Sequence, residues 1–169
     1  MTETIEYNSP IGVFKLTCNE DAVQSLLFSE KDQNQEIFSS NLYNPEPLLP
    51  ITKQAIKELN NYFDGSGFYF TVKFKQQGTA FQQAVWDALT SINPGKTQSY
   101  LQLSKSLGNV KAIRAVGTAN GKNAIAIIVP CHRVIGSNGS LVGYAGGLWR
   151  KKWLLEHEAK HFSGLQLLF

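Results

Sequence analysis

Cys131 and the basic residues beside it form the stretch of this sequence best suited to chemistry. Cys131 follows Pro130 and is followed directly by His132 and Arg133. A thiolate is a far better nucleophile than a thiol, and neighbouring cationic side chains lower the pKa of a cysteine. The tripeptide therefore predicts a nucleophilic cysteine, although a lone cysteine after an apolar segment is more often a small core residue. Its spacing fits neither a zinc site nor a redox pair.

The residues around Cys131 predict how the thiol is positioned. Residues 124–129 are all apolar, a run of the length and composition of a strand buried on both faces. Pro130 ends the run, because proline has no N–H to donate to a sheet. A Ser-Asn-Gly turn at 137–139 separates two short apolar pairs, 134–135 and 141–142, which predicts a hairpin. We expect a buried strand that delivers Cys131 to a fixed point.

Composition is that of an ordinary globular protein of 169 residues, with 43% hydrophobic and 17% charged residues. No apolar run approaches the roughly 18 residues of a membrane span, so no membrane association is expected. The N-terminus lacks the apolar core of a signal peptide, which predicts a cytoplasmic protein. The two cysteines, Cys18 and Cys131, provide neither a zinc quartet nor a disulfide framework. We expect no metal and no cofactor.

Charge is divided unevenly along the chain. Residues 1–78 hold six lysines, no arginine and ten acids, a net charge of −4, whereas residues 79–169 hold seven lysines, three arginines and three acids, a net charge of +7. The half that contains the thiol is basic enough to favour a polyanionic partner. A solvated basic face without a partner would give the same balance.

The first half predicts a small α+β unit without a chemical motif. Apolar, β-prone segments at 11–18 and 23–28 predict a hairpin, and 52–63 has helical spacing that ends at an Asp-Gly-Ser-Gly stop. Strict alternation over 68–75 predicts a half-buried strand. The polar, proline-containing segment 29–50 predicts an irregular connector, and Cys18 is expected in or near the core.

The second half predicts helices suited to binding a groove. Thr79 can cap a helix that reaches Ile92, after which 100–107 and 110–119 form two short helices separated by Gly108. Two short helices around a glycine turn have the outline of a helix-turn-helix. The second carries basic residues beside small ones, which allows close approach to a groove but equally suits tight helix packing. A glycine-rich loop, 143–147, precedes a last helix, 148–160, whose expected core residues are Leu148, Trp149, Trp153 and Leu155.

Taken together, these features resemble the O6-alkylguanine-DNA alkyltransferases, also called methylated-DNA–protein-cysteine methyltransferases. The resemblance rests on the Pro-Cys-His-Arg-Val sequence at 130–134 and on Asn123, eight residues before the cysteine. It extends without a gap over residues 78–158, while the first half resembles the family only in its general layout. The other matching segments are 78–86, 112–117, 144–148 and 153–158.

The resemblance implies an α+β fold of two domains. Residues 1–78 would form a small α/β, ribonuclease H-like supporting unit. Residues 79–169 would form a mostly helical DNA-binding alkyltransferase domain packed on it, with a helix-turn-helix and a short strand or hairpin carrying the active cysteine.

The resemblance also implies roles for individual residues. Cys131 would be the nucleophile and alkyl acceptor, His132 a base acting through a water, and Glu158 the group that orients the imidazole. Asn123 would hold the backbone between the cysteine and the groove-binding helix, and Tyr100 would help rotate the nucleotide outward. Arg114 would fill the gap left in the base stack. Besides Arg114, the implied contacts to DNA are Lys111, Ala115, Tyr100, Arg133, Gly117 and Asn120. The implied pocket residues are Val134, Tyr144, Ala145, Gly146 and Gly147.

The implied function is DNA repair by direct reversal, in a methylated-DNA–[protein]-cysteine S-methyltransferase that acts once. The protein would bind double-stranded DNA through the minor groove and flip out O6-alkylguanine, chiefly O6-methylguanine with O4-alkylthymine as a further candidate. It would transfer the alkyl group irreversibly to Cys131, as a monomer and without a cofactor. Two features depart from some family members: Ala145 replaces a hydroxyl residue that bonds the leaving oxygen, and the first half offers only Cys18 toward a zinc site.

Three other functions are compatible with parts of the sequence. A non-catalytic lesion-binding protein of the same fold would share the DNA-binding features, although it would not need Cys131. A cysteine hydrolase could use Cys131, His132 and Glu158, but adjacent Cys and His are poorly placed for direct proton transfer. A transcription factor without chemistry is supported only by the helix-turn-helix.

Overall fold

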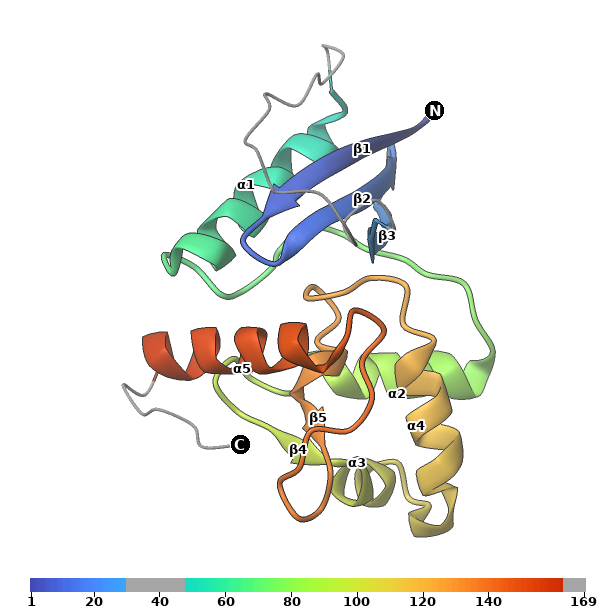
Figure 1. The fold of residues 1–169 in the computed structure, drawn as a ribbon. Coiled ribbons are helices and arrows are strands. Elements are labelled where there is room, and N and C mark those ends of the chain that lie inside the picture. The colour runs from blue at the N-terminus through green and yellow to red at the C-terminus, as the bar shows by residue number, and fades with distance from the viewer. Residues whose placement is uncertain (30–47, 163–169) are drawn as a thin grey trace. The chain divides into compact units, whose positions relative to one another are not determined.

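A computed structural model describes residues 1–29 and 48–162 of the chain (Figure 1). The chain divides into two compact units, Met1–Gln76 and Gln77–Phe169. A sheet and one helix form the first unit, and helices dominate the second, so the predicted α+β class is confirmed. The connector predicted over 29–50 lies mostly outside the described residues.

The N-terminal unit is a three-stranded antiparallel sheet with one helix on it. Strands β1 (Thr2–Ser9), β2 (Gly12–Asn19) and β3 (Val23–Phe28) lie in sequence order, and helix α1 (Pro50–Asp64) contacts β2 and β3. The predicted hairpin is confirmed as β2–β3, and Cys18 is buried as expected. Strand β1 was not predicted, because its outward side chains are polar and only three of its residues are buried. Gly65 ends α1 in the left-handed conformation, as its sequence stop indicated.

The strand predicted over 68–75 is wrong. This extended segment makes only one isolated parallel bridge, to Val23, instead of a ladder. Its backbone is held by the Glu58 carboxylate, which accepts hydrogen bonds from the N–H groups of Thr71 at 3.0 Å and Val72 at 3.1 Å. Alternation in the sequence therefore reflected one apolar side facing the core, without the backbone pairing that defines a strand.

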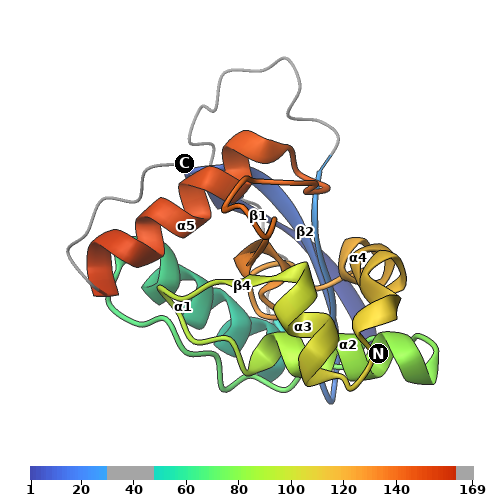
Figure 2. The same ribbon diagram turned by 90° about the horizontal axis from the view of Figure 1, so that it is seen from below.

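The C-terminal unit is built mostly from helices (Figures 1 and 2). Thr79 and Gln82 form a capping box at the start of the first helix, and Ser99 and Gln102 form another at the start of the second. The helices are α2 (Ala80–Thr90), α3 (Tyr100–Ser106), α4 (Ile113–Gly121) and α5 (Leu148–Phe162), with a 3₁₀ turn, η2 (Val110–Ala112), before α4.

Helices α3 and α4 form the predicted helix-turn-helix, and both contact α2. The Trp86 indole donates to the Ala119 carbonyl at 2.9 Å, which ties α2 to α4. Asn109 caps the 3₁₀ turn rather than the α-helix itself, so α4 begins three residues later than predicted. None of the described helices combines the length and apolar character needed to cross a membrane.

The segment before the cysteine is a tight arch, so the strand predicted over 124–129 is wrong. The Ile128 N–H donates to the Ala126 carbonyl at 2.7 Å across Ile127, whose φ is 68°. This is a γ-turn of the strained sign, and among the described residues Ile127 is the one non-glycine with positive φ. A second γ-turn, of the relaxed sign, brings the Cys131 N–H to the Val129 carbonyl at 2.8 Å. The apolar run is buried, but as a compact turn.

The hairpin predicted around 137–139 is replaced by a different pairing. The turn itself forms, with the Gly136 N–H donating to the Ser140 carbonyl at 2.8 Å, but 141–142 is not a strand. Strand β5 (Val134–Ile135) instead pairs in parallel with β4 (Gln98–Ser99). This pairing places the start of α3 beside the segment that follows the cysteine.

The strain at Ile127 gives a testable prediction. At an ordinary buried position, a variant with alanine has a higher free energy of unfolding than a variant with glycine. At a position with positive φ the glycine variant is favoured instead, by about 1 kcal/mol. We expect Ile127→Gly to unfold at higher urea concentration than Ile127→Ala, although both lose buried surface. Urea unfolding followed by tryptophan fluorescence reports on the C-terminal unit, which contains all three tryptophans.

The matched control is Ile125, which is fully buried and has no positive φ. There we expect alanine to be more stable than glycine. If the alanine variant were more stable than the glycine variant at both positions, the strained turn at Ile127 would be contradicted.

Candidate active site around Cys131

Cys131 is the first residue of a single 3₁₀ turn, η3 (Cys131–Arg133), at the end of the arch. Its side chain is nearly buried, with 8% of the residue exposed. The Asn123 amide holds the arch, since its Nδ2 donates to the Val129 carbonyl at 2.8 Å and its Oδ1 accepts from the Ile125 N–H at 3.1 Å. Asn123 is thus brought to the cysteine, and its position is consistent with the backbone-holding role that the sequence suggested.

The electrostatic setting of the thiol differs from the prediction. Burial raises the pKa of Cys131, while a hydrogen bond from Asn123 and the charge of Lys151 act in the opposite direction. The adjacent basic residues do not provide the expected charge. Burial lowers the pKa of His132, so its imidazole is neutral near pH 7, and the Arg133 guanidinium is paired elsewhere.

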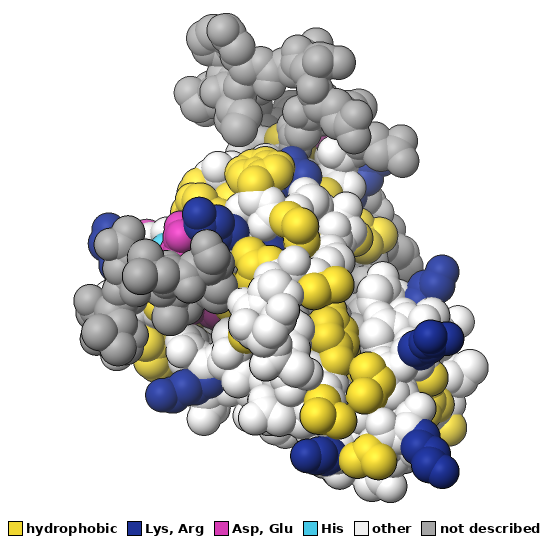
Figure 3. Space-filling model, turned by 60° about the horizontal axis from the view of Figure 1, so that its bottom comes forward, with side chains coloured by type: hydrophobic (Ala, Val, Ile, Leu, Met, Phe, Trp, Pro, Cys, Tyr) yellow, Lys and Arg dark blue, Asp and Glu magenta, His cyan; other side chains and the backbone are white. Residues whose placement is uncertain are grey.

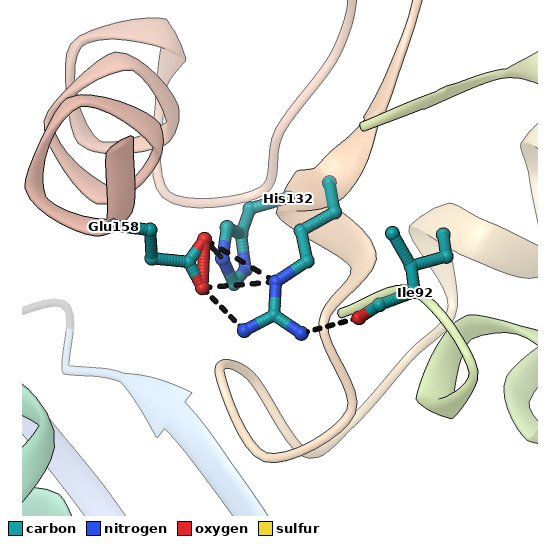
Figure 4. A network of polar contacts seen from close by, with 4 residues as sticks. Ile92, His132 and Glu158 are labelled. Atoms are coloured by element: carbon teal, nitrogen blue, oxygen red, sulfur yellow. Dashed lines mark hydrogen bonds and ion pairs between the residues drawn. The ribbon is translucent and has the colours of Figure 1, made fainter. Parts of the chain in front are cut away.

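The two residues that follow the cysteine form a buried ionic network with Glu158 (Figure 4). The carboxylate of Glu158, on α5, has no exposed surface and lies 3.1 Å from His132 Nε2. Arg133 donates from Nε to Glu158 Oε1 at 2.9 Å and from Nη2 to the same oxygen. Its Nη1 donates to the Ile92 carbonyl at 2.6 Å. One carboxylate therefore fixes two consecutive side chains of η3.

The network determines which nitrogen of His132 can act as a base. Burial alone would raise the pKa of Glu158, but the charges and hydrogen bonds of His132 and Arg133 hold it below its usual value. An ionised carboxylate needs a proton on His132 Nε2, so the lone pair of the neutral ring lies on Nδ1. Nδ1 is buried and, within the described part of the chain, has no hydrogen-bond partner. It is therefore available to take a proton.

Lys151 is a site residue that the sequence analysis missed. Its side chain has no exposed surface, and its Nζ donates to the carbonyls of Val142 at 3.0 Å and Gly143 at 3.2 Å. Burial lowers the pKa of Lys151 to about 8. The available signal was helical spacing, because Lys151 lies seven residues before Glu158 on α5 and so faces the same side of the helix.

Two tyrosines border the thiol. Tyr100 is half-buried at the start of α3, where its hydroxyl donates to the Val142 carbonyl at 3.1 Å. Its ring lies against Gly117 of α4, where an added Cβ would be 3.9 Å from the ring. The Tyr144 hydroxyl is buried, and burial raises its pKa well above the ordinary value, with the charge of Cys131 adding to the effect. Tyr100 thus links the site to the helix-turn-helix.

The predicted DNA contacts divide into exposed and buried residues. Lys111, Arg114 and Ala115 are exposed on η2 and α4, and Gly117 is partly exposed. Figure 3 shows basic side chains at the margin of a band of hydrophobic side chains on the face that includes α3. The exposed large apolar residues of η2, α4, the loop and early α5 are Val110, Ile113, Val142, Leu148 and Trp149.

Two of the predicted DNA contacts are buried in this structure. Arg133 is 5% exposed and bound to Glu158 and to the Ile92 carbonyl. Asn120 is 6% exposed, and its Nδ2 donates toward the Cys131 carbonyl at 3.4 Å. The core assignment of Leu148 and Trp149 is wrong, since 48% and 57% of these residues are exposed at the start of α5.

The predicted pocket residues differ in their exposure. Val134 has no exposed surface, Gly146 is buried, and Ala145 is exposed. The backbone of Gly143 and Gly147 has positive φ, which favours glycine at both ends of this loop. Over residues 1–29 and 48–162, no three His, Cys, Asp or Glu side chains are close enough together to hold a metal ion.

Comparison with known proteins places both units in one family. Residues 80–160 match the model of the 6-O-methylguanine DNA methyltransferase DNA binding domain, and residues 5–76 match that of the ribonuclease-like domain of the same family. The chain is 44% identical over 152 residues to the methylated-DNA–protein-cysteine methyltransferase of Methanosarcina acetivorans, covering 90% of this chain and 95% of that one.

Solved structures give the same result. The O6-methylguanine methyltransferase of Mycobacterium tuberculosis superposes with a TM-score of 0.79 and 39% identity, covering 95% of this chain and 94% of the other. The same protein in complex with DNA gives a TM-score of 0.79 and 40% identity over 92% of each chain.

The buried network gives a prediction about stability. Glu158→Gln leaves the Arg133 guanidinium buried without a counter-charge, and we expect it to lower the free energy of unfolding by about 3–5 kcal/mol. Because folding lowers the pKa of Glu158, its stabilisation is present above the usual value of 4.5 and is lost as the pH falls through the folded-state pKa. The difference from wild type should therefore shrink in acid, as measured by urea unfolding at several pH values.

Glu156→Gln is the matched control on the same helix. Glu156 pairs with Lys152 at 3.7 Å, and both side chains are exposed. Its loss should cost about 0.5 kcal/mol or less. Equal effects at the two positions would contradict the importance assigned to the buried pair.

Proposed function

Because the chain belongs to the 6-O-methylguanine DNA methyltransferase family, we propose that it repairs alkylated DNA by moving an alkyl group from guanine O6 to Cys131. The main support is that the residue directly after the cysteine is a histidine whose imidazole a buried carboxylate orients, within the matched DNA binding domain. Its relatives are named methylated-DNA–protein-cysteine methyltransferases, which agrees with this chemistry.

The transfer is a displacement at the alkyl carbon. The Cys131 Sγ attacks this carbon, an S–C bond forms, and the C–O6 bond breaks with its electron pair going to guanine. The thiol proton passes to His132 Nδ1 through a water, while Glu158 keeps the other ring nitrogen protonated. Guanine leaves once a hydrogen bond or proton reaches its oxygen or ring nitrogen. Because Ala145 lacks a hydroxyl, backbone N–H groups or water supply that bond.

DNA binding is assigned to the helix-turn-helix, with α4 in the minor groove. The exposed Lys111 and Arg114 meet the duplex, and the small residues Ala115 and Gly117 let the helix approach closely. The alkylated base is inside the stack, so it must be flipped out at a cost of roughly a few kcal/mol. Insertion of Arg114 into the gap offsets part of that cost. Tyr100, which lies between α4 and Cys131, is placed to crowd the rotating nucleotide.

The product is a thioether, whose new S–C bond would break only if a second nucleophile took the alkyl carbon and expelled the thiolate, so we expect each molecule to react once. The reaction as written needs no metal or cofactor. We assign the protein to the cytoplasm as a monomer, where a reducing environment keeps the thiol free. The N-terminal unit, matched to the ribonuclease-like domain of the family, is assigned a supporting role.

Mass spectrometry tests the proposed acceptor. Incubation with a duplex containing O6-methylguanine should add about 14 Da, a methyl in place of hydrogen, to the Cys131 peptide. Cys131→Ser should bind the same duplex but gain no mass, and Cys18 should remain unmodified in both proteins. Binding without a mass gain in the wild type would favour a lesion-binding protein, and turnover of an ester beyond one equivalent would favour a hydrolase.

Arg114 provides a test of base flipping. Arg114→Ala should slow methyl transfer from duplex DNA by roughly tenfold, because nothing then fills the emptied position in the stack. On a single-stranded oligonucleotide the defect should be much smaller, since there is no stack to fill.

Lys122→Ala, which removes an exposed charge at the other end of the same helix, is the control. It should reduce affinity in a salt-dependent way without distinguishing the two substrates. An equal Arg114→Ala defect on both substrates would contradict insertion.

A further inference from the structure

We propose that Trp149 and Arg150, at the start of α5, form a clamp that holds the end of the glycine-rich loop 143–147 and so sets how closely this loop fits the alkyl group. Arg150 is then a positioning residue, which acts on the substrate only through the backbone of Gly146. The inference rests on the proposed function for one premise, that the loop walls the pocket of Cys131.

The loop 143–147 has the features of a segment whose order depends on its neighbours. It lies outside any helix or strand, and the backbone has positive φ at both ends, at Gly143 and Gly147. One internal turn closes it, in which the Gly147 N–H donates to the Tyr144 carbonyl at 2.9 Å. Glycine leaves many backbone conformations accessible. Contacts from outside the loop therefore decide which of them is kept.

Arg150 supplies such a contact. Its Nη1 donates to the Gly146 carbonyl at 3.0 Å. Side chains on a helix lean toward its N-terminus, so a residue in the first turn of α5 can reach the loop that precedes the helix. Gly146 is buried, and a buried carbonyl needs a donor. A charged guanidinium donates a stronger hydrogen bond than a neutral group, so this contact favours the observed loop conformation.

Trp149 fixes the direction of the Arg150 side chain. The guanidinium carbon lies 4.8 Å from the centroid of the Trp149 ring, which is a cation–π contact. The same ring lies against the last residue of the loop, where a Cβ added to Gly147 would be 3.5 Å from Trp149 Cδ1. Because 57% of Trp149 is exposed, the ring contributes little to the core. Its contacts with Arg150 and Gly147 join the start of α5 to the loop.

Helix stability does not account for Arg150 at this position. Positive charge is unfavourable at the N-terminus of a helix, where the macrodipole is itself positive. The first turn of α5 nevertheless contains no acidic residue, and Arg150, Lys151 and Lys152 follow one another at its start. The carbonyls of Val142 and Gly143, at the other end of the loop, accept from Lys151. Consecutive residues of α5 thus contact both ends of the loop.

The fit of the loop should matter most for the smallest alkyl group. A methyl group fills little space, so its position relative to the sulfur depends on a wall that lies close to it. Displacement of a reacting group by about 1 Å can slow a reaction by up to roughly a hundredfold. A benzyl group is larger and would still contact a loop that has moved outward. We therefore expect the clamp to favour transfer of methyl over transfer of benzyl.

Hydrogen–deuterium exchange in the free protein tests the clamp without DNA. In Arg150→Ala the amides of 143–147 should exchange roughly tenfold faster, because the loop opens more often. Exchange in α2 should be unchanged, which would exclude a general loss of stability. Trp149→Ala should resemble Arg150→Ala, whereas Trp149→Phe keeps an aromatic face beside the guanidinium and should stay close to the wild type. If Arg150→Ala does not fold, Arg150→Met, which has a long side chain without a donor, provides the same comparison.

Alkyl transfer measures the consequence at the pocket. Single-turnover rates on duplexes that contain O6-methylguanine or O6-benzylguanine give the ratio of methyl to benzyl transfer. Arg150→Ala should slow methyl transfer by roughly tenfold and benzyl transfer by much less, so the ratio should fall. Trp149→Phe should keep the ratio of the wild type. The matched control is Lys152→Ala, which removes an exposed lysine paired with Glu156 and should change neither the ratio nor the exchange of the loop.

The outcomes separate this inference from the proposed function. Unchanged loop exchange in Arg150→Ala would overturn the clamp, and equal slowing of both substrates would overturn its effect on the fit of the alkyl group. A wild-type protein that transfers neither group would instead refute the proposed function, and the exchange rates would still decide whether Trp149 and Arg150 hold the loop.

Discussion

The carboxylate of Glu158 is the charge on which the geometry of the cysteine segment depends. It is fully buried, and an isolated buried carboxylate would be strongly disfavoured. His132 and Arg133 together satisfy its oxygens, and Arg133 carries the connection on to the Ile92 carbonyl after α2. The single turn of η3 is therefore held from α5 on one side and from α2 on the other. This short turn has few backbone hydrogen bonds of its own, so the contacts of the His132 and Arg133 side chains hold it in place.

The same segment contains a strained backbone conformation that its surroundings hold in place. A β-branched residue in the left-handed region is costly, and Ile127 remains there because the Asn123 amide and the surrounding apolar packing hold the arch closed. The relaxed γ-turn at Pro130 then directs the chain into Cys131. A regular strand would continue past the cysteine in one direction, whereas this arch ends at a defined point and exposes a small part of the thiol. Order in the cysteine segment is thus supplied by side chains rather than by a sheet.

The reactive centre and the proposed DNA-binding helices are connected through few contacts. The short β4–β5 pairing places Tyr100 at the start of α3, and its ring rests on Gly117 of α4. Asn120 of α4 points inward to the Cys131 carbonyl. The exposed side of α4 is therefore available for DNA while its inner side contacts the cysteine segment.

The sequence by itself determined the α+β class, the helices with capping boxes and the helix-turn-helix, because capping residues and helical spacing are local properties. The grouping of Cys131, His132 and Glu158 came instead from the resemblance to a family, through its distinctive short motifs. Tertiary structure decided the rest. An apolar run is compatible with a strand or a buried turn, and tertiary contacts that include the Asn123 hydrogen bonds favour the turn. The direction of the Arg133 side chain depends on Glu158 of α5, which is distant in the sequence, so the sequence could not show that Arg133 turns inward rather than outward to DNA. The burial of Lys151 depends likewise on the distant Val142 and Gly143 carbonyls, since charge in a folded protein is set by what surrounds it in space.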